Sequence, residues 1–222
     1  MPRLPLLAVA SVTTMILTGC AGPAAAPTGA QAGDGALVAF YGDSYTLGTG
    51  ATAPGRRWST IVCAERGWRE FNPSVNGLGF INHRTQFGDG SGDLPSLVLA
   101  QRPDIVFVTM GLNDNFSYDF AAGRIHDQID ADLARLAQGL PHARFLVVEP
   151  FWYTDTRPES LENISGWVEQ AARSIHADYI SGASHWMEGH PEWMAADGLH
   201  PNDDGYAEMA RRMDAELAKL EL

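Results

Sequence analysis

The stretch Asp104-Ile-Val-Phe-Val-Thr-Met110 is the clearest predicted strand of the chain. A short, continuous apolar run rich in β-branched residues is typical of a strand that is covered on both faces. Comparable apolar runs occupy 37–41 and 144–148, and weaker strands are predicted at 70–75 and 178–180. The sequence therefore predicts a sheet with a buried centre.

Amphipathic segments separate these strands. Helices are predicted at 58–66 and 94–101, the second of which Pro103 stops. Apolar residues recur every three or four positions in three further segments, at Ile125, Ile129, Leu133 and Leu136, at Leu161, Ile164, Val168 and Ile175, and at Tyr206, Met209, Met213, Leu217 and Leu220. Asn202 is the predicted N-cap of the last helix. This alternation indicates βα units around a mostly parallel sheet, an α/β fold.

The composition limits the functional classes. The chain has 222 residues, 45% of them hydrophobic, with 27 Asp and Glu against 15 Lys and Arg and a formal net charge of −12. This length suits one domain, and the acidic balance argues against a nucleic-acid partner, because phosphate binding needs clustered Lys and Arg. The two cysteines form no zinc-binding pattern, the spacing of the histidines lacks a third ligand, and no metal site is expected.

The first residues have the pattern of an export signal. Arg3 precedes an apolar run of about 14 residues, from Leu4 to Leu17, which is shorter than the roughly 20 that cross a bilayer. Leu17-Thr-Gly-Cys20 resembles the lipobox of bacterial lipoproteins, which implies a diacylated Cys20. We expect a signal peptide at 1–19, a flexible tether at 20–35 and one domain at 36–222, exported and attached to the membrane only through this lipid. The alternative is a plain secretory signal with an incidental cysteine.

Three polar motifs follow predicted strands or precede the last helix. Gly42-Asp43-Ser44 follows the first strand, Gly111-Leu-Asn-Asp114 follows the strand that ends at Met110, and Asp197-Gly-Leu-His200 precedes the last helix. Open α/β sheets place their sites at the carboxyl ends of strands. A serine hydroxyl needs a base to become nucleophilic, and His200 is the candidate base for Ser44. Asp197, three residues earlier, is the candidate partner that orients the imidazole.

These motifs, in this order, resemble the SGNH (GDSL) hydrolase family. Asn72-Pro-Ser-Val-Asn-Gly77 matches the spacing of the family's second block, so the resemblance spans about 36–212. It implies a three-layer, flavodoxin-like α/β/α sandwich and a serine esterase that needs no cofactor. It also implies a catalytic triad of Ser44, Asp197 and His200.

The resemblance further implies three oxyanion donors. These are the backbone N–H groups of Ser44 and Gly77 and the side-chain amide of Asn113, with Gly79 as the alternative glycine. A glycine lets a donor N–H approach the substrate closely. Asp43 and Asp114 are expected to be structural acceptors for backbone N–H groups. Cys63 lies in an apolar helical stretch and is expected to be a buried side chain.

The substrate is less well indicated. Tyr45 stands where the family usually has leucine, so a lipase-like acyl preference does not transfer directly. We expect a short-chain carboxylic ester, such as an acetyl group on an extracellular or cell-envelope glycan. Two alternatives remain open: an acyltransferase that uses the same acyl-enzyme, and a non-catalytic glycan-binding surface lipoprotein. Aromatic side chains near the motifs either pack under loops or line a pocket, namely Phe80, Tyr118, Phe151, Trp152, Tyr153, Trp186 and Trp193.

Overall fold

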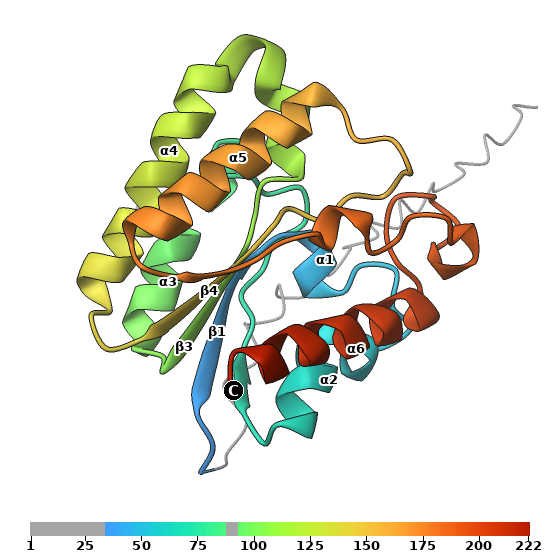
Figure 1. Cartoon of the computed structure of the whole chain (residues 1–222), viewed down its shortest axis with the longest axis horizontal. Coiled ribbons are helices and arrows are strands. Elements are labelled where there is room, and N and C mark those ends of the chain that lie inside the picture. Colours follow the sequence, from blue (N-terminus) through green and yellow to red (C-terminus); the bar gives the residue numbers. More distant parts are fainter. Residues whose placement is uncertain (1–33, 88–92) are drawn as a thin grey trace, which may run out of the picture.

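A five-stranded parallel sheet forms the centre of the computed structural model, which describes residues 34–87 and 93–222 (Figure 1). The strand order is β2-β1-β3-β4-β5, with β1 at Leu37–Gly42, β2 at Arg69–Phe71, β3 at Ile105–Thr109, β4 at Arg144–Val148 and β5 at Asp178–Ile180. Cys20 and the predicted signal peptide lie outside the described residues, as does all but the end of the predicted tether.

Helices cover both faces of this sheet (Figure 1). One face carries α3 (Leu94–Gln101), α4 (Tyr118–Gly139) and α5 (Glu159–Ser174), and the other carries α2 (Trp58–Glu65) and α6 (Asp203–Lys219). Short 3-10 helices occupy Pro54–Arg56, Arg84–Phe87, Asn113–Ser117, Ala183–His185 and Pro191–Trp193. The three-layer α/β/α prediction is confirmed.

The strands divide their side chains between two hydrophobic cores because successive residues point to opposite faces. Val106 and Val108 of β3 join the core beneath α3, α4 and α5. Ile105 and Phe107 of the same strand join the core beneath α2 and α6. Burial on both faces explains why the central strands are continuous apolar runs rather than alternating ones.

One predicted boundary was wrong. The second strand was expected at 70–75, but β2 begins at Arg69 and ends at Phe71. The Asn72 side chain accepts a hydrogen bond from the Ser74 backbone and donates to the Thr46 carbonyl, so it turns the chain away from the sheet. Pro73, which has no N–H, cannot continue a ladder. At α6 the expectation holds, because Asn202 caps the helix by accepting from the N–H groups of Asp204 and Gly205.

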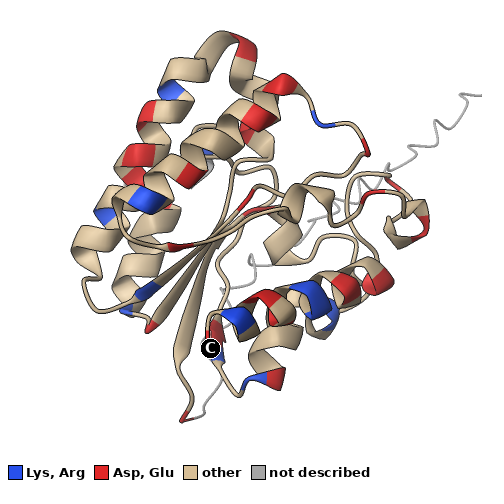
Figure 2. Cartoon of the chain, viewed as in Figure 1, with Lys and Arg blue, Asp and Glu red and all other residues tan. Residues whose placement is uncertain are grey.

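Acidic and basic residues are intermingled over the outer helices (Figure 2). In the described part of the chain, no helix combines the length and the apolar character that a bilayer crossing requires.

Candidate active site

Ser44 lies at the junction of β1 and a short helix, α1 (Ser44–Leu47). Asp43 is the N-cap of this helix, and its carboxylate accepts a hydrogen bond of 3.0 Å from the Tyr45 N–H. As the first helical residue, Ser44 has a backbone N–H with no partner within the helix. The residue is almost fully buried, at 4% exposure. The strand-to-helix turn predicted for this serine is therefore present.

The predicted acid and base are paired in a tight turn. His200 Nδ1 lies 2.7 Å from Asp197 Oδ2, while Asp197 Oδ1 accepts from the N–H groups of Leu199 and His200 at 2.9 and 3.0 Å. The hydrogen bond from the imidazole, followed by these two backbone bonds, lowers the pKa of Asp197 to about 2. The aspartate is therefore ionised at neutral pH and orients the ring, which leaves His200 Nε2 available for proton transfer.

Tyr45 connects the serine turn to the histidine turn. Its hydroxyl donates a hydrogen bond of 2.7 Å to the Leu199 carbonyl, and its ring centroid lies 6.1 Å from that of His200. The described residues contain no hydrogen bond between Ser44 Oγ and the imidazole. Catalytic hydrogen bonds of free hydrolases commonly form only when substrate is bound. The structure thus links the turn that carries the predicted base to the residue that follows the predicted nucleophile.

Asn113 links its own motif to the Gly42-Asp43-Ser44 motif and to Leu78, the residue after the Asn72–Gly77 block. It follows β3 and begins a 3-10 helix, and its amide nitrogen donates to the Leu78 carbonyl at 3.0 Å and to Asp43 Oδ2 at 3.3 Å. Both partners are acceptors, which fixes which end of the side chain carries the nitrogen. The longer bond, to Asp43, is the weaker of the two. An incoming oxyanion therefore has to compete with one of these acceptors.

Asp43 and Asp114 are structural acceptors, as predicted. Asp114 accepts from three consecutive backbone N–H groups, those of Phe80, Ile81 and Asn82, at 2.7, 3.0 and 3.2 Å. These bonds tie the loop that follows the Asn72–Gly77 block to the Gly111–Asp114 motif. Burial raises the pKa of Asp114, and burial raises the pKa of Asp43 to about 7. The cost of burying two carboxyl groups is partly offset by the backbone N–H groups that they bind.

The two candidate glycines differ in what their N–H groups do. The Gly79 N–H donates to the Asn82 carbonyl at 2.9 Å, and a Cβ at this residue would lie 2.5 Å from the Asp114 carboxylate. Gly79 thus lets Asp114 approach the loop. Gly77 has a positive φ of 70°, and in the described part of the chain its N–H enters no backbone hydrogen bond. Of the two, the available donor is Gly77.

Comparison with known proteins identifies the family. The sequence profile of the GDSL-like lipase/acylhydrolase family matches residues 40–208, which include all four motifs. The chain belongs to this family. It is accordingly a carboxylic ester hydrolase of the GDSL type.

A named relative supports this assignment, and two solved structures share the fold. The chain is 31% identical over 198 residues to the GDSL lipase Rv0518 of Mycobacterium tuberculosis, covering 83% of this chain and 82% of that protein. The fold is similar to that of the psychrotrophic esterase EstA from Pseudoalteromonas sp., with a TM-score of 0.65 and 17% identity over 83% of this chain and 97% of the other. It is also similar to Axe2, an acetylxylan esterase from Geobacillus stearothermophilus, with a TM-score of 0.59 and 21% identity over 81% and 92%.

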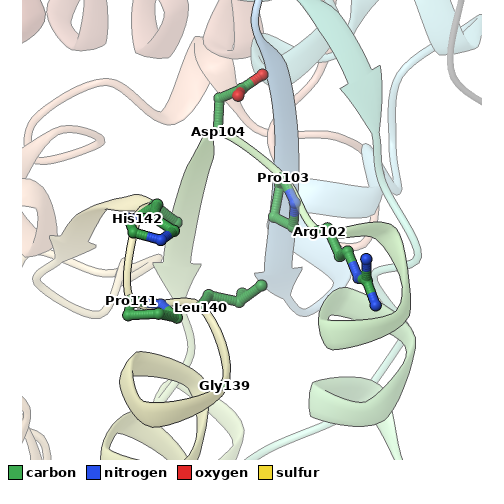
Figure 3. A pocket seen from close by; sticks show the side chains of 8 residues that line it. Arg102, Pro103, Asp104, Gly139, Leu140, Pro141 and His142 are labelled. Atoms are coloured by element: carbon green, nitrogen blue, oxygen red, sulfur yellow. The ribbon is translucent and has the colours of Figure 1, made fainter.

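A cavity of about 340 Å³ adjoins the Asp197 turn of this GDSL hydrolase. Residues on both sides of Asp197 line it together with a loop that follows β4, namely Tyr153, Asp155, Met187, Pro191, Met194, Ala195, Ala196 and Gly198. Another hollow, of about 370 Å³, lies between Arg102–Asp104 and Gly139–Ala143 (Figure 3). Those segments lead into the amino ends of β3 and β4, at the edge of the sheet opposite the GDSL motifs.

Most of the aromatic residues near the motifs pack against other side chains, and Tyr153 lines the cavity. Phe80 is fully buried against Tyr41, and Tyr118 stacks on Trp167 at 5.8 Å between ring centroids. Phe151 and Trp186 are also buried and pack against each other. Packing therefore accounts for most of these side chains, whereas Tyr153 lines the cavity.

The remaining predictions concern Cys63 and metals. Cys63 is buried as expected, and burial raises the pKa of its thiol, which makes it a poor nucleophile. Among residues 34–87 and 93–222, no group of three or more His, Cys, Asp or Glu side chains is arranged to hold a metal ion.

Sequence reasoning missed a charged cluster around Arg84, which follows the loop after Gly77. Arg84 donates to both carboxylate oxygens of Asp132 at 2.6 and 2.8 Å and to Asp93 at 2.7 Å. The Tyr41 hydroxyl donates to the same Asp132 at 2.6 Å. The residues come from four separate segments with no shared spacing, so the sequence carried no signal for the cluster.

Proposed function

We propose that this GDSL hydrolase is a serine esterase that cleaves short-chain acyl esters, with Ser44 as nucleophile, His200 as base and Asp197 as the residue that orients the base. The observation that carries this proposal is the 2.7 Å contact between His200 Nδ1 and Asp197 Oδ2, in a turn bonded to the residue that follows Ser44. Such a pair supplies the general base that a serine requires.

The proposed reaction has two stages. Ser44 Oγ attacks the ester carbonyl carbon while its proton passes to His200 Nε2. When the tetrahedral intermediate collapses, the C–O bond to the alcohol breaks and the imidazolium protonates the departing alcohol. Water, deprotonated by the same nitrogen, then attacks the acyl-serine, and the carboxylic acid leaves as Ser44 regains its proton.

The proposed oxyanion donors are the N–H groups of Ser44 and Gly77 and the amide of Asn113. The Ser44 N–H has no partner within its helix, and the Gly77 N–H enters no backbone hydrogen bond in the described part of the chain. The Asn113 amide is held near the nucleophile by Asp43. Donors that are positioned before the reaction stabilise the developing charge without reorganisation.

Packing around the motifs supports a short acyl group. Tyr45, Leu78 and Leu112 are the neighbours of Ser44, Gly77 and Asn113 in the chain, and each is at most 2% exposed. Side chains packed this fully into the core expose almost no apolar surface, so none of the three offers a lining for a long acyl chain. The cavity beside the Asp197 turn is proposed to hold the alcohol part of the ester. Likeness in fold to an acetylxylan esterase suggests an acetylated glycan as the substrate class.

Turnover of p-nitrophenyl acetate, butyrate and octanoate, with Ser44→Ala as control, tests this function. We expect kcat/KM to fall from acetate to octanoate, and we expect the Ser44→Ala protein to lose at least about 10⁴-fold in kcat. Release of acetate from acetylated xylooligosaccharides then tests the glycan. A preference for octanoate would contradict the short-chain assignment, and full activity of the Ser44→Ala protein would contradict the mechanism. Acylation of an added glycan in place of acid release would reassign the enzyme as a transferase.

We further propose that the enzyme is exported and anchored through a lipid on Cys20. The support is the run Leu17-Thr-Gly-Cys20 after a short apolar segment. Palmitate labelling of cells that produce the native chain or its Cys20→Ala variant tests the anchor. Labelling of the native chain alone is expected, and equal labelling of both would remove Cys20 from the proposal.

A further inference from the structure

Tyr45 follows the proposed nucleophile, at the position where the family usually has leucine. Unlike leucine, it has a hydroxyl group, and this group makes a hydrogen bond. The residue is 1% exposed, and its hydroxyl donates to the Leu199 carbonyl at 2.7 Å. We propose that Tyr45 is a positioning residue that holds the His200 turn in place beside Ser44. This inference rests on the proposed function, because it assigns Tyr45 a role in placing the proposed base.

The internal bonds of the Asp197 turn define its shape but not its location. Asp197 binds His200 Nδ1 and the N–H groups of Leu199 and His200, so all three bonds lie within four consecutive residues. The turn is also on the surface, where the Asp197 side chain is 48% exposed. A base held in this way keeps its tautomer, yet its distance from Ser44 depends on contacts with the rest of the protein.

The Tyr45 hydroxyl supplies such a contact from the residue bonded to Ser44. Its acceptor is the carbonyl of the peptide group whose nitrogen belongs to His200. The ring itself is held, because it stacks on Phe151 with 5.6 Å between centroids and an interplanar angle of 15°. Burial raises the pKa of Tyr45 well above its usual value, so the hydroxyl remains a donor throughout the working range of an esterase. A leucine side chain has no donor to offer.

A comparable bond elsewhere provides a matched control. The Tyr206 hydroxyl of α6 donates to the Thr49 carbonyl at the same distance, 2.7 Å, and Tyr206 is also buried. This bond joins α6 to the chain after α1 and does not involve residues 197–200. Tyr45→Phe and Tyr206→Phe therefore each remove one buried tyrosine-to-carbonyl hydrogen bond and keep the ring, but only the first change removes a direct hydrogen bond to the histidine turn.

The inference predicts a change in the chemical step. Misplacement of a catalytic group by about 1 Å can cost about 10²-fold in rate, so we expect Tyr45→Phe to lower kcat for p-nitrophenyl acetate by about 10- to 100-fold. KM should stay within about twofold, because Tyr45 is only 1% exposed and the Tyr45→Phe change keeps its ring. Phosphorylation of Ser44 by diethyl p-nitrophenyl phosphate should slow by the same factor. Tyr206→Phe should show a similar shift in melting temperature with near-native kcat.

A double substitution separates positioning from general destabilisation. If Tyr45 acts through His200, Tyr45→Phe will not change the residual turnover of a His200→Ala protein, because there is no base left to position. An equal loss in both backgrounds would overturn the inference, as would a Tyr45→Phe protein with native kcat. The single variants Ser44→Ala and His200→Ala test the proposed function independently. If these two are inactive while Tyr45→Phe is native-like, the inference fails and the proposed function stands; if they are active, the proposed function fails.

Discussion

At the scale of single residues, Asn113 has two tasks. Its amide nitrogen donates to the carbonyl of Leu78, the residue after Gly77, and to the carboxyl group of Asp43 in the first motif. The same amide is the proposed side-chain donor to the oxyanion. Because the Asp43 bond, at 3.3 Å, is the weaker of the two, we expect it to be the one that the oxyanion replaces.

Asn113→Ala is predicted to give a folded enzyme with kcat for p-nitrophenyl acetate lowered by about 10² to 10³-fold, the usual cost of one oxyanion donor. Loss of the two hydrogen bonds should also lower the free energy of unfolding by about 1–3 kcal/mol. Asn115→Ala, two residues further on, removes only an acceptor for the Ser160 hydroxyl and serves as control. Equal kcat values for the two variants would exclude Asn113 as a donor.

At the scale of elements, α4 holds the loop that carries Gly77. Arg84 follows that loop and is bound by Asp132 of α4, whose side chain is only 2% exposed. The same arginine donates to the Phe80 carbonyl at 2.9 Å. The loop is therefore fastened to the helix layer through one guanidinium group.

Asp132→Asn is predicted to lower the free energy of unfolding by about 2–3 kcal/mol, because it leaves a partly buried guanidinium without its main partner. This is below the usual 3–5 kcal/mol for a broken buried pair, since Arg84 keeps its bond to Asp93. Asp130→Asn on the same helix removes an exposed carboxylate and should change stability by less than about 0.5 kcal/mol. Urea unfolding measures both, and similar midpoints would contradict this role of Asp132.

At the scale of the whole molecule, the parallel sheet brings the carboxyl ends of β1 and β3 to one edge. The polar motifs that follow these strands then meet beneath packed loops, which is why two carboxyl groups, Asp43 and Asp114, are buried there. Burying a charged group costs free energy, so stability should depend on the protonation of these groups.

Native Asp43 has a pKa of about 7, raised by burial from 3.8. Between about pH 4 and pH 7 the native state therefore holds a proton that the unfolded chain has released, and stability falls as pH rises through this window. A difference of about 3 pKa units corresponds to about 4 kcal/mol at most. Asp43→Asn should flatten this fall in melting temperature between pH 4 and 8, while the exposed Asp119→Asn variant should follow the native protein. Parallel curves for all three proteins would contradict the assignment to Asp43.

The fold class and the order of the motifs could be predicted from local sequence patterns. Burial of the central strands on two faces leaves continuous apolar runs, and each helix leaves a stripe with a period near 3.6 residues, so local patterns report the layers. Asn202 was recognisable as a cap because its partners are two and three residues away. The pairing of Asp197 with His200 was equally local. The end of β2 was misjudged because Asn72 turns toward Thr46, a contact made across the fold.

The contacts that hold the motifs in place could not be predicted, because their partners are far apart in the chain. The Tyr45 hydroxyl meets a carbonyl 154 positions away, and Arg84 meets an aspartate 48 positions away. The loop that carries Gly77 and Gly79 is likewise held by Asp114, which lies 32 positions from the Asn82 N–H that it accepts from. Contacts of this kind have no period and no spacing in the chain. They arise when helices and loops pack on the sheet, and the lowest free energy of that packing is a property of the whole molecule.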